Sequence, residues 1–100
     1  LMQSSGVGNC INMLALTAGC RFPLVMIVTM RGEWAEFNPA QVPMGRATEP
    51  ALRLMGLATH RCETEESVGP TVEAALAAAF GAEEAVAVIL SQKLLGRKTW

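Results

Sequence analysis

Aspartate and tyrosine are absent from the sequence of 100 residues, and its nine acidic residues are all glutamates. Without aspartate the chain cannot carry a metal–diphosphate motif of the Gly-Asp-Gly type, nor a Ser-His-Asp triad of the usual composition. Cysteine is scarce: Cys10, Cys20 and Cys62 are odd in number and form neither a CxxC motif nor a cluster with histidine. They predict buried thiols in a reducing compartment rather than disulfides, and no residue is assigned as a metal ligand.

Long hydrophobic runs are also missing. The longest, residues 24–30 and 85–90, are much shorter than the roughly 20 residues that a helix needs to cross a membrane. A secretory pattern is absent from the start, so the cytoplasm is the expected compartment. The net charge of -1 argues against a nucleic-acid partner. Residues 1–92 are interpreted as one domain portion, and 93–100 as a solvated basic tail.

Apolar runs alternate with helical periods along the chain, which is typical of an α/β fold. Strands are expected at 1–2, 24–30, 57–62 and 85–90, and helices at 9–18, 48–56 and from a start between 64 and 70 to 81. Residues 34–46 show no sustained period and are expected to form a long rim loop. This order predicts right-handed crossovers and a partial doubly wound parallel sheet with helices on both faces.

The expected helices have identifiable starts and apolar faces. Ser4 or Ser5 is predicted to cap the first helix, and Thr48 the second, ahead of Pro50. The apolar face of the first helix consists of Ile11, Leu14, Ala15 and Ala18. The buried stripe of the last helix consists of Val72, Ala75, Leu76, Ala79 and Phe80.

Polar residues follow each expected strand, where open parallel sheets bind their ligands. The groups are residues 3–9, 31–33, 63–64 and 91–92. In the first group, Gly6 and Gly8 match the first two glycines of a dinucleotide-binding motif, but Ile11 occupies the third position. From this group alone, a ligand site and a plain strand–helix turn remain equally open.

The segment LMQSSGVGNCIN, residues 1–12, resembles the Met-Gln-Asn-Ser-Gly-Leu-Gly-Asn-x-Ile-Asn segment of phosphonopyruvate decarboxylases and of the alpha subunit of sulfopyruvate decarboxylase. The resemblance continues with Pro23-Leu24, the apolar strand and Arg31-Gly32-Glu33, and covers nearly the whole chain. It implies the pyrimidine-binding domain of a thiamine-diphosphate-binding fold, with residues 1–92 as the C-terminal portion of that domain.

The same resemblance implies a carbon–carbon lyase that decarboxylates an acidic 2-oxoacid, such as 3-sulfopyruvate or phosphonopyruvate, to an aldehyde. It implies thiamine diphosphate as the cofactor, with Mg²⁺ held by a diphosphate-binding beta subunit or domain in a hetero-oligomer. The family's catalytic glutamate would lie upstream of Leu1, so the chain is expected to be a fragment that is inactive alone and no catalytic residue is assigned.

The resemblance also implies roles for residues of two rim groups. The residues expected to contact the cofactor are Ser4, Ser5, Gly6, Gly8 and Asn9. Ser4 replaces the family's asparagine, so no hydrogen bond is carried over at that position. Arg31 and Glu33 are expected at the substrate; the alternative for Arg31 is an ion pair with Glu33 or Glu36.

Three side chains carry open alternatives. Trp34 and Phe37 could form a hydrophobic lid or pack the loop onto the sheet, and His60 is expected to be structural or on the surface.

Two other function classes also stay open: a non-catalytic nucleotide- or phosphate-binding βαβ module, and an assembly domain. The module would require an acidic residue after the second strand, where the sequence has Arg31.

Overall fold

The four strands are parallel and pair in the order β1-β2-β4-β3. The computed structural model describes residues 1–97 and 99. Its elements are β1 (Met2–Gln3), α1 (Ser4–Cys10), η1 (Asn12–Leu14), α2 (Ala15–Cys20), β2 (Leu24–Thr29), η2 (Pro39–Gln41), α3 (Val42–Leu54), β3 (Ala58–Cys62), α4 (Glu65–Ala82), β4 (Ala85–Leu90) and α5 (Gln92–Leu95). None of the helices in these residues is long and apolar enough for a membrane span.

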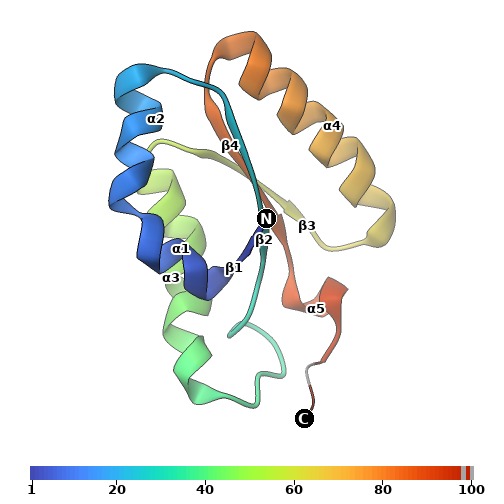
Figure 1. Ribbon diagram of the computed structural model, residues 1–100. Coiled ribbons are helices and arrows are strands. Elements are labelled where there is room, and N and C mark those ends of the chain that lie inside the picture. The colour runs from blue at the N-terminus through green and yellow to red at the C-terminus, as the bar shows by residue number, and fades with distance from the viewer. Residues whose placement is uncertain (98, 100) are drawn as a thin grey trace.

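The helices cover both faces of the sheet. Helices α1, α2 and α3 lie on one face, and α4 covers the other (Figure 1), where Leu94 of α5 also packs. The central strand β4 is almost fully buried, as its unbroken apolar sequence predicted. The α/β class, the parallel sheet and the two helical layers are therefore confirmed.

The first helix differs from its prediction. It begins at Ser4 rather than at Asn9, and neither serine caps it, because Gln3 is the N-cap residue and makes no side-chain cap bond. The helical path continues through η1 and α2 to Cys20. Of the expected apolar face, Leu14 is buried but Ala15 and Ala18 are exposed. The buried positions here are Leu14 and Thr17, three residues apart, where the chain passes through the 3-10 turn η1 into α2.

The prediction of a loop over residues 34–46 was wrong for residues 39–46, which form the 3-10 turn η2 and the start of helix α3. Helix α3 begins at Val42, with a proline in its first turn, and Pro50 lies inside it rather than at its start. Thr48 is not a cap: it is buried, and its Oγ1 donates to the carbonyl of Met44 at 2.6 Å. Pro43 is equally suited to a first helical turn. The predicted start of this helix at Thr48–Pro50 was therefore wrong, because the helix begins earlier, at Val42, with Pro43 in its first turn.

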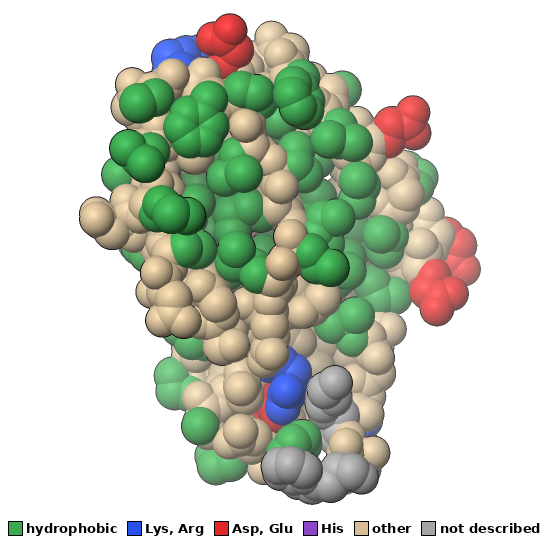
Figure 2. Space-filling view, in the orientation of Figure 1, with side chains coloured by type: hydrophobic (Ala, Val, Ile, Leu, Met, Phe, Trp, Pro, Cys, Tyr) green, Lys and Arg blue, Asp and Glu red, His purple; other side chains and the backbone are tan. Residues whose placement is uncertain are grey.

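Helix α4 begins and ends near its predicted limits, but its buried stripe is narrower than expected. Ala75 and Ala79 are buried, whereas Leu76 is 44% exposed and Phe80 is 68% exposed. Hydrophobic side chains gather on the face of the molecule that Figure 2 shows. Part of the apolar sequence thus covers the surface rather than the core.

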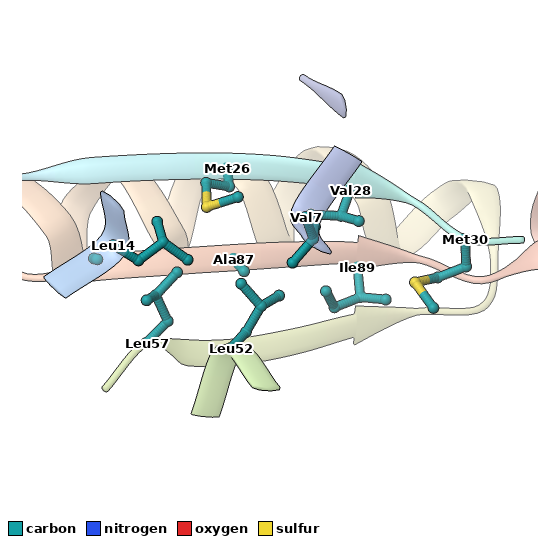
Figure 3. Packing of buried hydrophobic residues seen from close by; sticks show 10 residues of the cluster. Val7, Leu14, Met26, Val28, Met30, Leu52, Leu57, Ala87 and Ile89 are labelled. Carbon is teal, nitrogen blue, oxygen red and sulfur yellow. The ribbon is translucent and has the colours of Figure 1, made fainter. Parts of the chain in front are cut away.

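The main core lies between the sheet and the α1–α3 layer. Val7 of α1 and Leu52 of α3 are fully buried there against Val28, Ala87 and other strand residues (Figure 3). The second, smaller core lies under α4 and includes Cys62. Cys10 is only partly buried and Cys20 is exposed, so the prediction of buried thiols holds for Cys62 alone.

The short helix α5 was not predicted. Ser91 caps it, since its Oγ accepts a hydrogen bond from the Leu94 N–H at 3.1 Å. Lys93 lies within this helix, inside the stretch interpreted as a basic tail. Lys98 and Trp100 of that tail are outside the described residues.

Candidate functional site

A pocket of about 280 Å³ opens at the carboxyl ends of β1, β2 and β4. Its lining consists of Gln3, Thr29, Met30, Arg31, Gln92, Leu95 and Gly96. Polar residues at or just after the ends of three of the four strands therefore meet at one place, as expected for the ligand-binding edge of an open parallel sheet. Residues 63–64, which follow the edge strand β3, do not line this pocket.

Gln92 connects the end of β4 to the loop that follows β2. Its side chain is buried, and its Oε1 accepts hydrogen bonds from the backbone N–H groups of Glu33 and Trp34, both at 3.0 Å. Its Nε2 donates to Glu36 Oε1 at 2.9 Å. An amide nitrogen carries two donors, and the bond to Glu36 uses one of them.

Glu36 is the anchor of the same loop. Its carboxylate accepts hydrogen bonds from Arg31 Nε at 2.7 Å and from Arg31 Nη2, and also from the backbone N–H groups of Gly32 at 2.9 Å and Asn38 at 3.2 Å. The Arg31 side chain is the main cause that holds the pKa of Glu36 well below its usual range; the backbone bonds and Gln92 add to it, and burial opposes it. Sequence reasoning did not single out Glu36 as a site residue.

Arg31 lines the pocket and forms an ion pair with Glu36. Of the two carboxylates that the sequence offered as partners, Glu33 and Glu36, the structure has Glu36. The hydrogen bonds to Glu36 raise the pKa of Arg31 against the effect of burial, which keeps the guanidinium charged. The guanidinium also lies 5.4 Å from the ring centre of Phe37. Within the described residues, Nη1 makes no hydrogen bond, so one edge of the fork is available to an anionic ligand.

Glu33 lies apart from the pocket lining. Its carboxylate accepts a hydrogen bond from the Gln92 backbone N–H at 2.7 Å and pairs with Arg61 Nη1 at 3.0 Å. It therefore joins the start of α5 to the edge strand β3. Trp34 is 42% exposed, and His60 is exposed on β3, where the sequence placed it.

Two glycines allow the start of α3 to lie against the loop after β2. Gly32 has a φ of +79°, and a Cβ there would lie 2.0 Å from the Gln41 carbonyl oxygen. A Cβ on Gly45 would lie 2.3 Å from the Gly32 carbonyl oxygen. Gln41, at this junction, accepts a hydrogen bond from Gln3 Nε2 at 3.2 Å, which brings α3 into contact with the pocket wall.

The five residues expected at the cofactor lie at the start of α1. Ser4 is buried, and its Oγ accepts a hydrogen bond from the Arg31 N–H at 3.1 Å, so it joins the ends of β1 and β2. Gly8 lies close to Met44 of α3, since an added Cβ would be 3.4 Å from its sulfur. Ser5 and Asn9 are exposed, and Gly6 is partly exposed. None of the five lines the pocket, and their contact with a cofactor stays a prediction.

No group of histidine, cysteine or glutamate side chains in the described part of the chain could hold a metal ion. The pocket instead offers amide groups, one guanidinium and backbone N–H groups. Such donors and acceptors suit a polar heterocycle or an anion rather than a directly bound cation.

The fold and the pocket define an α/β protein with a candidate ligand pocket at the carboxyl edge of its parallel sheet. The chain has homologues among sulfopyruvate decarboxylases. It is 44% identical over 95 residues to the sulfopyruvate decarboxylase subunit alpha of Methanothermobacter thermautotrophicus, which covers 90% of this chain and 55% of that subunit. It is 42% identical over 67 residues to the corresponding subunit of Methanocaldococcus jannaschii, covering 66% of this chain and 40% of that subunit.

A longer relative is named sulfopyruvate decarboxylase, without the words subunit alpha. The sulfopyruvate decarboxylase of Methanosarcina acetivorans is 37% identical over 81 residues, which is 80% of this chain and 21% of that protein. The chain thus spans about half the length, or less, of the curated relatives that it matches. No family model matches the chain. No solved structure matches it either.

Proposed function

We propose that this chain is part of a thiamine-diphosphate-dependent decarboxylase that acts on an acidic 2-oxoacid, with 3-sulfopyruvate as the favoured substrate. The observation that carries the proposal is the match to a sulfopyruvate decarboxylase alpha subunit over 90% of the chain. The pocket at the carboxyl edge supports it, because the matched chain places a charged arginine and two amide side chains at the position where such sheets bind ligands.

The pocket residues fit a cofactor with a polar heterocycle. Gln3 carries an amide that can both donate and accept, which suits the edge of an aminopyrimidine. Gln92, whose Oε1 is occupied by the backbone N–H groups of Glu33 and Trp34, would contribute only an N–H donor. When bound, thiamine diphosphate would supply an electron sink for the carbanion that loss of carbon dioxide creates. The described residues have no cluster for Mg²⁺, so we assign the metal and the diphosphate to a partner subunit or domain.

Arg31 is the residue of this chain that we assign to the substrate. Its Nη1 is available at the pocket, while Glu36 holds the other side of the guanidinium in a fixed orientation. A guanidinium fork suits the oxygens of a sulfonate, a phosphonate or a carboxylate. Binding of the head group at Arg31 would orient the keto group toward the cofactor.

We assign Glu33 a structural role, because its carboxylate forms an ion pair with Arg61 and accepts a hydrogen bond from the backbone N–H at the start of α5.

A non-catalytic phosphate-binding module would use the same pocket. It gains no support from the matched relatives, all of which are named as decarboxylases or their subunits.

A chimera tests the proposal. The 95 matched residues of the Methanothermobacter alpha subunit are replaced by those of this chain, and the product is combined with its partner subunit, thiamine diphosphate and Mg²⁺. We expect carbon dioxide release from 3-sulfopyruvate, with phosphonopyruvate and pyruvate as weaker substrates. An assembled chimera that binds its partner but decarboxylates none of the three would contradict the proposal; the unmodified subunit is the control.

A further inference from the structure

The ion pair between Arg31 and Glu36 sets the charge at the pocket. The side chains of Arg31 and Glu36 are only 15% and 4% exposed. Glu36 is ionised at neutral pH, because the hydrogen bonds from Arg31 hold its pKa well below the usual range. The pair therefore brings one positive and one negative charge to the same place, and their sum is zero.

The carboxylate of Glu36 is fixed in its position. Its Oε1 accepts hydrogen bonds from Arg31 Nε, the Gly32 N–H and Gln92 Nε2, and its Oε2 accepts from Arg31 Nη2 and the Asn38 N–H. Because both oxygens are held, the carboxylate cannot turn away when an anion approaches Arg31. Nη1 is the nitrogen of the guanidinium that Glu36 does not occupy.

Other charged side chains contribute little at this position. Among the described residues that line the pocket, Arg31 alone is charged. Arg97 follows the lining residue Gly96, but it is exposed, so water and salt screen its charge. A separate hollow is lined by two cations together with two carboxylates, which are Arg61, Lys93, Glu33 and Glu63.

Sulfonate and phosphonate head groups differ in charge more than in shape. Each presents three oxygens to which a guanidinium can donate. A sulfonate carries a single negative charge, whereas a phosphonate, like a phosphate monoester, loses a second proton close to neutral pH. The charge of the site is therefore the property that can distinguish the two.

A fixed carboxylate beside the arginine favours the singly charged head group. The cost of taking an anion out of water rises with the square of its charge, whereas its attraction to the site rises only in proportion to that charge. Glu36 opposes the attraction by Arg31, which leaves too little to offset the hydration that a second negative charge loses. Without Glu36, the doubly charged ligand would gain twice as much attraction as the singly charged one.

We propose that Glu36 determines the specificity of this site, because its fixed charge makes Arg31 select a singly charged sulfonate over a doubly charged phosphonate. The inference rests on the proposed function, since it places the head group of the 2-oxoacid at Arg31. Glu36 does not touch the substrate; it acts through Arg31 and through its own charge.

Binding of two unreactive analogues tests the proposal. 3-Sulfopropanoate and 3-phosphonopropanoate have a methylene group in place of the keto group, so they are not 2-oxoacids and do not react. Calorimetry with the assembled chimera at pH of about 8 gives a Kd for each. We expect Glu36→Gln to shift the ratio of the two Kd values by roughly tenfold in favour of the phosphonate, because it removes one unit charge beside the guanidinium of a partly buried site.

Glu49→Gln is the matched control for this variant. Glu49 is also ion-paired with arginines, namely Arg53 and Arg61, but it does not line the pocket. The substitution removes the same charge at a distance from Arg31, so the ratio of the two Kd values should stay as in the parent.

Leu95→Lys tests the same electrostatics without a change to the ion pair. Leu95 lines the pocket and is 48% exposed, so a lysine there can be accommodated at the surface and adds a positive charge. It should shift the ratio in the same direction as Glu36→Gln. Its control is Leu54→Lys, because Leu54 is 87% exposed and lies outside the pocket lining.

Turnover separates this inference from the proposed function. In the chimera with Glu36→Gln, the ratio of kcat/KM for phosphonopyruvate to that for 3-sulfopyruvate should rise by roughly tenfold, even if both values fall because Arg31 is held less firmly. A shifted Kd ratio in a chimera that decarboxylates neither substrate would support the role of Glu36 and contradict the proposed function.

Three results would overturn the role of Glu36, whatever the turnover. The first is an unchanged Kd ratio in folded Glu36→Gln or, if that variant does not fold, in Leu95→Lys. The second is an equal shift in Glu49→Gln. The third is binding of both analogues that Arg31→Ala leaves unchanged, which would place the head group elsewhere.

Discussion

Gly45→Ala should destabilise the fold, although it places a better helix former inside α3. The added Cβ would lie 2.3 Å from the Gly32 carbonyl oxygen, 2.4 Å from its carbon and 2.7 Å from the Arg31 carbonyl oxygen. All three are backbone atoms, and Glu36 and Gln92 hold this loop in place through Gly32 and Glu33. The loop cannot yield as a flexible side chain would.

The magnitude follows from two opposing effects. Overpacking of a tight site costs about 1–3 kcal/mol, and a contact with fixed backbone lies at the upper end. Alanine in place of a helical glycine contributes about 1 kcal/mol in the other direction. The expected net loss is about 2 kcal/mol in the free energy of unfolding, or roughly 8–16 °C in melting temperature for a domain of this size.

Urea denaturation followed by circular dichroism measures the effect. The matched control is Gly81→Ala in α4, where an added Cβ meets nothing within 4 Å. This variant should be as stable as the parent or more stable by up to about 1 kcal/mol. Equal stabilities of the two variants would refute the close contact between α3 and the loop after β2.

Three further predictions concern the site. The carboxylate of Glu36 has a folded-state pKa below its ordinary value of 4.5, so its contribution to stability is present above that pH and is lost as the pH falls through the folded pKa. The parent should therefore have a lower free energy of unfolding at pH of about 3.5 than at about 7, and urea titrations should show a smaller difference between these pH values for Glu36→Gln. In the chimera, Arg31→Ala should reduce kcat/KM for 3-sulfopyruvate by roughly ten- to a hundredfold with only partial recovery in Arg31→Lys, and a main effect on thiamine diphosphate affinity would assign Arg31 to the cofactor instead. The chain alone should release no carbon dioxide from 2-oxoacids and show no tight thiamine diphosphate binding by calorimetry, since it has no metal cluster in its described residues. Measurable turnover would contradict the proposal that it is one part of the enzyme.

The strands were predictable because their signal is local. The unbroken apolar runs of β2 and β4 require burial on both faces, and that requirement fixes a parallel sheet under two helical layers. The helix starts were less predictable. Pro43 and Pro50 carry the same start signal, and the sequence does not distinguish them; in the fold α3 begins at Val42, where Gly45 packs closely on the backbone of Gly32.

The pocket was predictable in position but not in its bonding. Residues at the carboxyl ends of three strands meet, as the topology requires. The partner of Arg31 was left open between Glu33 and Glu36, because both follow it within a few residues and only the loop geometry selects Glu36. The role of Gln92 depends on contacts with Glu33 and Trp34, which are distant in sequence and leave no local pattern.

The location of the cofactor tests the central claim most directly. A structure of the chimeric enzyme, assembled with its partner subunit and thiamine diphosphate, would show which residues of this chain contact the cofactor. We predict that the pocket lined by Gln3, Arg31 and Gln92 opens onto the cofactor, with Arg31 directed at the substrate space. A cofactor bound elsewhere, with this pocket facing solvent or filled by another part of the protein, would contradict the account.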